Sequence, residues 1–328
     1  GDEADVTIDI TNTSLLPIPW LQVTDSIPLA LRLTAPLRAA FGVSAGASRQ
    51  IVYRIRGARR GYYRLGPLRL TTGDVLGLYV RSMTIPVAEM TVFPRVMPLP
   101  HLQLPAQLPF GPLSTRQRRG EDPARPMGAR PYQSSDGVRR LDWKASARHG
   151  ELLVRRAEPS VAPETMVALA FRAADYPAHV AKDSLERAVV TAASLSAALL
   201  QRKLPVGLVT NGIDPRNPSA DVVLAHGKGD GHLQMLLHLL GRLDVGTQTA
   251  LPELLARQVL PWGGTLALIV GDLDVTMLPQ LDALRRRGQH VVAYLLEPTA
   301  SGLAFARNQG LATVSVDERG VPLPLRHA

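Results

Sequence analysis

Apolar and polar residues alternate over the first hundred positions of the chain. The alternation has a period of two residues, the period at which the side chains of a β-strand return to the same face. Runs of this kind cover residues 6–10, 18–23, 50–55, 65–70, 77–80 and 90–93. Proline and glycine separate the runs at a spacing of roughly ten residues, with no helical period between them. The pattern predicts an Ig-like β-sandwich domain over residues 1–98.

Prolines dominate the next stretch. They occur at positions 94, 98, 100, 105, 109, 112, 123 and 126. Such a density excludes regular helix and favours an extended connection that lies over the surface. We therefore expect a connector over residues 99–164, and we expect its charged part, residues 113–125, to be mobile.

The pattern changes again after residue 164. Short, mainly apolar runs are typical of strands that are buried on both faces, and they occupy residues 166–171, 206–210, 265–270, 291–296 and 312–316. Between them, apolar residues recur at three- and four-residue spacing, which predicts helices near 231–241, 250–258 and 276–287. A longer helix is expected to start with Asp183 and Glu186 as a capping box and to stop before Pro205. This alternation predicts a doubly wound parallel-sheet domain over residues 165–328, after the β-domain.

The composition fits two ordinary globular domains. The chain has 328 residues, of which 45% are hydrophobic and 20% are charged, and domains usually have about 100–200 residues. The absence of cysteine excludes disulfides, thiolate metal sites and a cysteine nucleophile. No apolar run reaches the length of about 20 residues that a membrane helix needs. The acidic start runs directly into strand-like alternation, so we expect that further sequence precedes residue 1.

The net charge of +9 raises the question of nucleic-acid binding. The arginines are spread along the chain, however, and no aromatic residues interleave with the densest groups at 116–119 and 285–287. Single-strand binders usually combine a basic track with stacking aromatic residues, and aromatic residues make up only 5% here. We therefore favour solvated faces or an anionic partner surface over nucleic-acid binding.

The familiar catalytic motifs are missing. No glycine-rich phosphate loop follows the first strand of the α/β pattern, no His-Glu-x-x-His metal spacing occurs, and no Gly-x-Ser-x-Gly turn is present. Asp175, Thr210, Asp272 and Asp274 follow strands and could in principle surround a hard cation. Single aspartates in such places commonly serve as helix caps and turn residues, and we favour that interpretation. The chain is accordingly predicted to have no enzymatic activity and no cofactor.

Residues 130–158, which we call the Trp box, have the most unusual composition of the chain. Arginines, acids and two aromatic residues are concentrated there; the candidate binding residues are Arg130, Tyr132, Asp136, Arg139, Arg140, Asp142, Trp143, Lys144 and Arg148. They could form a surface for acidic groups, with Tyr132 and Trp143 as anchors. Alternatively, local acids could pair with the arginines while Trp143 fills the seam between the two domains. We favour the interdomain role, although the two are compatible.

The Trp box resembles the signature of the bacterial family called domain of unknown function 58. That signature contains Arg-x-Tyr, then Gly-Asp-x-x-Arg-x-Ile-Asp-Trp-Lys-x-Ser-Ala-Arg, then Leu-x-Val-Arg. In register with it lie Tyr132, Asp136, Arg139, Asp142, Trp143, Lys144, Ser146, Ala147, Arg148, Leu152, Val154 and Arg155. Ser135 and Leu141 replace the usual Gly and Ile. Residues 60–78 are similar to a second signature of the family, with Val-Leu in place of its usual Pro-Phe.

The resemblance implies a fold and a partner. Family members have two membrane helices upstream of the sandwich, which would place the protein at the cytoplasmic face of the bacterial inner membrane. Their carboxyl-terminal part is similar to a von Willebrand factor A domain. They are typically encoded beside a MoxR-type AAA+ ATPase and are thought to assist the assembly or maturation of other proteins. We therefore expect a non-enzymatic interaction module that works with such an ATPase.

The resemblance also suggests an alternative, a divalent-cation-dependent adhesion or ligand-binding domain. Von Willebrand A domains often hold Mg²⁺ at an Asp-x-Ser-x-Ser loop, with a Thr and a further Asp from later loops. Here the first loop lacks that motif and contains Arg172, so Asp175, Thr249 (or Thr247) and Asp272 would form only a degenerate site. An arginine repels a cation, and we expect no metal.

Overall fold

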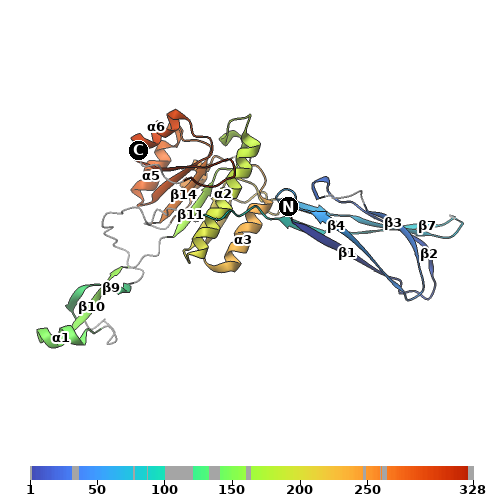
Figure 1. The fold of residues 1–328 in the computed structure, drawn as a ribbon, viewed down its shortest axis with the longest axis horizontal. Coiled ribbons are helices and arrows are strands. Elements are labelled where there is room, and N and C mark those ends of the chain that lie inside the picture. The colour runs from blue at the N-terminus through green and yellow to red at the C-terminus, as the bar shows by residue number, and fades with distance from the viewer. Residues whose placement is uncertain are drawn as a thin grey trace.

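A computed structural model describes residues 2–31, 37–76, 78–86, 88–99, 121–132, 141–159, 164–246, 249–258, 260 and 264–323. At 121–130, 149 and 155–159 it describes the backbone alone. Figure 1 shows three parts: strands β1–β8, a small projection, and a layered region of strands and helices. We call the first the β region, the second the Trp-box element and the third the α/β region.

The β region consists of antiparallel strands. They are β1 (Glu3–Thr11), β2 (Ile18–Asp25), β3 (Arg38–Val43), β4 (Ser48–Arg56), β5 (Gly61–Leu65), β6 (Leu68–Gly73), β7 (Val80–Ile85) and β8 (Ala88–Val92). A four-stranded sheet has the order β3-β2-β6-β7, and two-stranded sheets are formed by β1 with β4 and by β5 with β8.

Two small hydrophobic clusters join these sheets. Leu21, Val23 and Val43 of the four-stranded sheet pack with Ile10 and Ile51 of the β1–β4 pair. A second cluster, centred on Ile27, Leu31 and Ile55, connects the β1–β4 pair to β5 and β8. The alternation in the sequence therefore places one face of each strand inward, as expected for packed antiparallel sheets.

The Trp-box element lies within the predicted connector. It comprises β9 (Glu121–Pro131), α1 (Trp143–His149) and β10 (Leu153–Pro159). β9 and β10 pair antiparallel, so the proline-rich sequence forms one strand of a two-stranded sheet instead of a plain surface connection. Of the segment expected to be mobile, residues 121–125 belong to β9 and residues 113–120 lie outside the described residues.

The α/β region alternates strands with helices. Its strands are β11 (Thr165–Leu169), β12 (Val206–Thr210), β13 (Val222–Gly227), β14 (Thr265–Val270), β15 (His290–Leu295) and β16 (Ala312–Ser315). Its helices are α2 (Ala181–Gln201), α3 (Gly229–Arg242), α4 (Leu251–Arg257), α5 (Leu278–Arg286) and α6 (Ala300–Asn308). Each strand expected from an apolar run is present, whereas β13 and α6 were missed.

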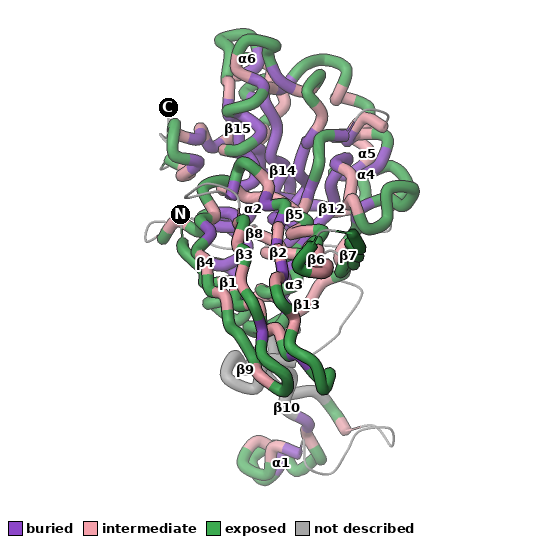
Figure 2. The backbone as a smooth tube through the Cα atoms, turned by 90° about the vertical axis from the view of Figure 1, so that its right-hand side faces the viewer, coloured by how far each residue is buried: buried purple, intermediate pink, exposed green. Residues whose placement is uncertain are grey.

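These strands form one sheet with the order β13-β12-β11-β14-β15-β16. All neighbouring pairs are parallel except β12 with β13, which are antiparallel. The sheet is therefore mixed, and the prediction of a parallel sheet was wrong at this edge, because a short return loop leads from β12 directly into β13. Helices α2 and α3 cover one face and α4, α5 and α6 the other. Figure 2 shows how burial concentrates in these central strands.

Helix α2 follows the predicted apolar stripe but starts earlier than expected. It begins at Ala181 with Val180 at the N-cap position, so Asp183 lies in its first turn. The capping box expected from Asp183 and Glu186 is not formed, because the helix has already started before Asp183; Glu186 forms an ion pair with Arg60. The architecture of β followed by α/β is confirmed. No described helix has the length and apolar character needed to cross a membrane.

Candidate functional site

Helix α1 is fixed to β10 by a small hydrogen-bond network. The Asp142 side chain accepts a bond from the Ala145 amide and so caps the helix. The Ser146 hydroxyl donates to the Asp142 carbonyl at 2.7 Å and accepts from the Leu153 amide at 2.8 Å. Gly150 then ends the helix with a positive φ of 73°, a conformation that glycine adopts without strain. Seven helical residues are thus held in place by polar bonds rather than by a large core.

The outer face of α1 exposes the Trp-box side chains. Trp143 is 64% exposed, and Lys144 and Arg148 beside it are exposed as well. Figure 1 shows α1 standing apart from both the β region and the α/β region. Trp143 therefore does not fill the seam between the two domains, and that preferred interpretation was wrong. The sequence could not reveal this, because the position of α1 depends on the β9–β10 pairing.

The remaining Trp-box residues are only partly described. Tyr132 is half-buried, and its amide donates to the Leu152 carbonyl at 2.8 Å. Arg130 pairs through its backbone with Val154. Asp136, Arg139 and Arg140 lie outside the described residues, so their expected ion pairs and contacts stay predictions.

Arg60, in the second signature, occupies the seam that we had assigned to Trp143. Its side chain is only 8% exposed, and it forms an ion pair with Glu186 on α2. Its Nη1 donates to the carbonyl oxygens of Leu240 and Leu243 at the end of α3, and its guanidinium lies 5.1 Å from the Phe171 ring centroid. Each nitrogen of this buried guanidinium has a partner, so Arg60 strongly restricts how the β region lies against α2 and α3. The second signature includes Arg60, but nothing in it indicated that this side chain would be buried between the two regions.

The carboxyl ends of the central strands hold the candidate cation ligands. Asp175 accepts bonds from the Arg172 guanidinium at 2.8 and 3.1 Å and from the Asn211 amide group at 3.0 Å. Asn211 also donates to the Thr249 carbonyl, at 3.3 Å. A cation at Asp175 would have to displace a guanidinium from the same oxygen atom, which is electrostatically unfavourable.

Asp272 has a structural role nearby. Its carboxylate accepts bonds from the Leu273 amide and from both the amide and the hydroxyl of Thr299. Thr299 in turn caps α6. Asp274 similarly caps the short helical turn that follows it. Asp274 thus caps a helical turn, as predicted, whereas Asp272 holds the residue that caps α6. Within the described residues, no group of three His, Asp or Glu side chains is placed to hold a metal ion.

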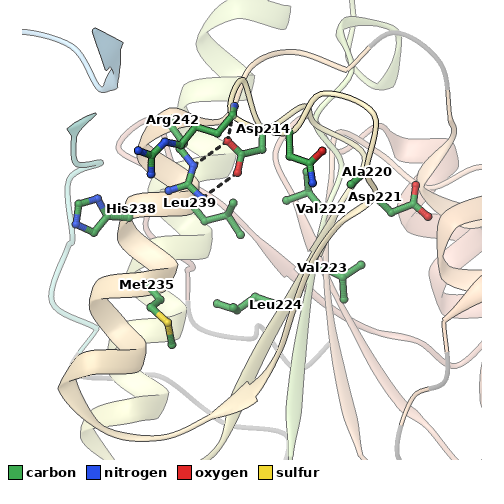
Figure 3. A pocket seen from close by; sticks show the side chains of 12 residues that line it. Asp214, Ala220, Asp221, Val222, Val223, Leu224, Met235, His238, Leu239 and Arg242 are labelled. Carbon is green, nitrogen blue, oxygen red and sulfur yellow. Dashed lines mark hydrogen bonds and ion pairs between the residues drawn. The ribbon is translucent and has the colours of Figure 1, made fainter. Parts of the chain in front are cut away.

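A cavity of about 520 Å³ lies elsewhere, between β13 and α3. Figure 3 shows its two walls, with Leu224 on β13 and Met235, His238 and Leu239 on α3. Asp214 and Arg242 form an ion pair at its far end, with two contacts of 2.8 Å. Because β13 itself was missed, no pattern in the sequence had indicated this cavity.

Comparison with known proteins identifies the family. The family model described as "Protein of unknown function DUF58" matches residues 128–303, which is more than half of the chain. The chain belongs to the DUF58 family. The DUF58 match starts in β9 and ends in α6, so it covers most of the Trp-box element and of the α/β region but not the β region.

A curated relative supports a wider similarity. The chain is 23% identical over 246 residues to "Uncharacterized protein YeaD" of Bacillus subtilis (strain 168). The alignment covers 73% of this chain and 58% of that protein, so this DUF58 chain spans little more than half of its relative's length.

Proposed function

We propose that this chain is a non-enzymatic protein-interaction module that works with a MoxR-type AAA+ ATPase in the assembly or maturation of other proteins. Membership of the DUF58 family supports the choice of partner, through the resemblance described above. The single observation that carries the proposal is the exposure of Trp143 on a projecting, hydrogen-bonded helix. Tryptophan and arginine are enriched among the residues that dominate the binding energy of protein interfaces, and α1 presents both on one exposed helix.

The chemistry of the α1 face fits an acidic protein surface. Trp143 would supply the apolar anchor, and Lys144 and Arg148, one helical turn apart, would pair with carboxylates around it. The network around Ser146 supports this role, since an anchor binds more tightly when its helix is ordered before binding.

We further infer an Ig-like fold for the β region and a von Willebrand factor A-like fold for the α/β region. The packed antiparallel sheets support the first. The central parallel strands with helices on both faces support the second. We also propose that a segment outside this chain tethers the protein to the cytoplasmic face of the inner membrane, as the family resemblance implies.

A pull-down with the purified MoxR-type ATPase tests the proposal. Wild-type chain and Trp143→Ala are compared, with Val275→Ala as the matched control, because Val275 is 69% exposed on the α/β region. We expect the wild type and the control to retain the ATPase and Trp143→Ala to lose it. Retention by the wild type and both variants alike, or by none of the three proteins, would contradict the proposal.

A further inference from the structure

Strand β13 forms an open edge of the six-stranded sheet. Within the part of the chain that the structure describes, it pairs with β12 alone, which leaves one row of its backbone N–H and C=O groups unpaired. Natural proteins usually protect such edges with lysine, proline or a covering segment. The sequence of β13, Val-Val-Leu-Ala-His-Gly, contains no proline, lysine or acidic residue. Its edge is therefore chemically suited to accept another strand.

The cavity beside this edge offers an apolar receptor. Leu224 on β13 and Met235 on α3 lie on its two walls (Figure 3). Met235 is 53% exposed although it lies among apolar neighbours. Methionine adapts its shape to different partners and is common at surfaces that bind peptides. A volume of about 520 Å³ accommodates one or two apolar side chains rather than a whole domain.

The charges around the cavity are largely neutralised. Burial of Asp214 opposes its ionisation, but the hydrogen bonds from Arg242 and from the Arg216 amide outweigh this and lower the pKa of Asp214. The guanidinium of Arg216 binds Glu89 of β8 at 2.8 Å. Asp221, just before β13, remains as an exposed acid. The cavity therefore favours an apolar occupant with a basic residue toward Asp221. It does not favour binding of a strongly charged small molecule.

The cavity is continuous with the contact between the β region and the α/β region. His238, which lines the cavity, packs edge-to-face on Phe93 with ring centroids 4.6 Å apart. Arg216 lines the cavity as well and reaches Glu89 across the same contact. An occupant would thus touch side chains that already hold the two regions together.

We propose that the β13 edge and its cavity bind an extended segment of a partner protein, which adds to the sheet as a strand and places an apolar side chain between Leu224 and Met235. The backbone bonds supply affinity and the cavity supplies selectivity, as in other cases of strand addition. This site is separate from α1, so the inference goes beyond the proposed ATPase contact.

Disulfide trapping tests the proposal, because the chain has no cysteine of its own. Met235→Cys is equilibrated in a thiol–disulfide buffer with the peptide Arg-Leu-Thr-Cys-Thr-Leu-Thr, whose cysteine and leucines share one face of a strand. Two further peptides have the same sequence but carry methyl groups on alternate backbone nitrogen atoms. One is methylated at even-numbered residues and the other at odd-numbered residues. Val275→Cys serves as the matched control.

Strand addition uses the N–H groups of alternate residues only. One methylated peptide is therefore expected to form about tenfold less mixed disulfide with Met235→Cys than the parent, since losing two bonds of about 1 kcal/mol is sufficient for this. The other methylated peptide should match the parent, and Val275→Cys should not discriminate. The proposal would be overturned if all three peptides formed the same amount of mixed disulfide, or if both methylated peptides formed less than the parent. A disulfide-linked dimer of Met235→Cys in the absence of peptide would also overturn it.

Discussion

The guanidinium of Arg60 contacts both carboxylate oxygens of Glu186, at 3.0 and 3.1 Å. The two residues are separated by 126 positions in the sequence, and their contact joins the β region to helix α2. Since Arg60 also binds the carbonyl oxygens at the end of α3, a single side chain fixes two helices relative to the β region.

Replacing Arg60 with alanine should weaken this contact. We expect Arg60→Ala to lower the free energy of unfolding by about 2 kcal/mol, because it leaves the Leu240 and Leu243 carbonyls without their charged donor. Urea denaturation measures the effect. Arg54→Ala is the control, since Arg54 pairs with Glu3 and Asp5 on the exposed surface and its loss should change stability little. Equal effects of the two substitutions would contradict the assigned role of Arg60.

Ser146 should control the order of α1. Ser146→Ala removes the hydroxyl that joins the Asp142 carbonyl to the Leu153 amide. We expect the amides of α1 and β10 to exchange with solvent about tenfold faster, consistent with the loss of about 1–2 kcal/mol of local stability. Hydrogen exchange detects this, whereas exchange in the α/β region should not change. Unaltered protection of the Leu153 amide would show that the network does not hold the helix.

Acid should destabilise the protein through His226. Burial lowers the pKa of His226, although the carboxylate of Glu164 at 4.0 Å opposes the shift. The unfolded chain then binds a proton near pH 6.5 while the folded chain resists it. Stability is therefore complete above that pH and declines as the pH falls below it, toward the lower pKa of the folded state.

Chemical denaturation between pH 5 and 8 measures this dependence. His226→Gln should have a flatter profile than the wild type. A residual slope is expected, because burial lowers the pKa of His290 as well. Identical profiles for the wild type and His226→Gln would assign the acid sensitivity to other groups.

Divalent cations should not stabilise the α/β region. Asp175 is occupied by Arg172 and Asn211, and Asp272 by Thr299. A cation that binds only the folded state must raise the melting temperature. We expect millimolar Mg²⁺ or Mn²⁺ to leave the melting temperature unchanged, as measured by calorimetry. A clear increase would favour the cation-dependent alternative instead.

Local pattern was enough to predict most of the α/β region. Its central strands are mainly apolar, and the stripe on α2 from Leu185 to Leu199 repeats at helical spacing, so each element is encoded within a short window. β13 and β9 escaped detection for different reasons. β13 is an edge strand with exposed positions, and β9 contains three prolines, which are tolerated because both strands of a two-stranded sheet are edge strands.

The candidate site depended on longer-range contacts. The motif around Trp143 pointed to the correct stretch. The local sequence does not distinguish an exposed helix from a helix whose tryptophan is buried between the two regions. The seam is instead filled by Arg60, whose hydrogen-bond partners lie 126 to 183 positions away. Pairings at such distances leave no periodic signal in a single sequence.

The binding of the MoxR-type ATPase to Trp143→Ala tests the central claim most directly. Calorimetric titration and melting curves are recorded on the same preparations of wild type and variant. If Trp143 is an anchor on a free surface, Trp143→Ala should bind the ATPase about thirtyfold more weakly or worse, with an unchanged melting temperature. A lower melting temperature with unchanged affinity would contradict the claim, because it would make Trp143 a structural residue and not a contact for the partner.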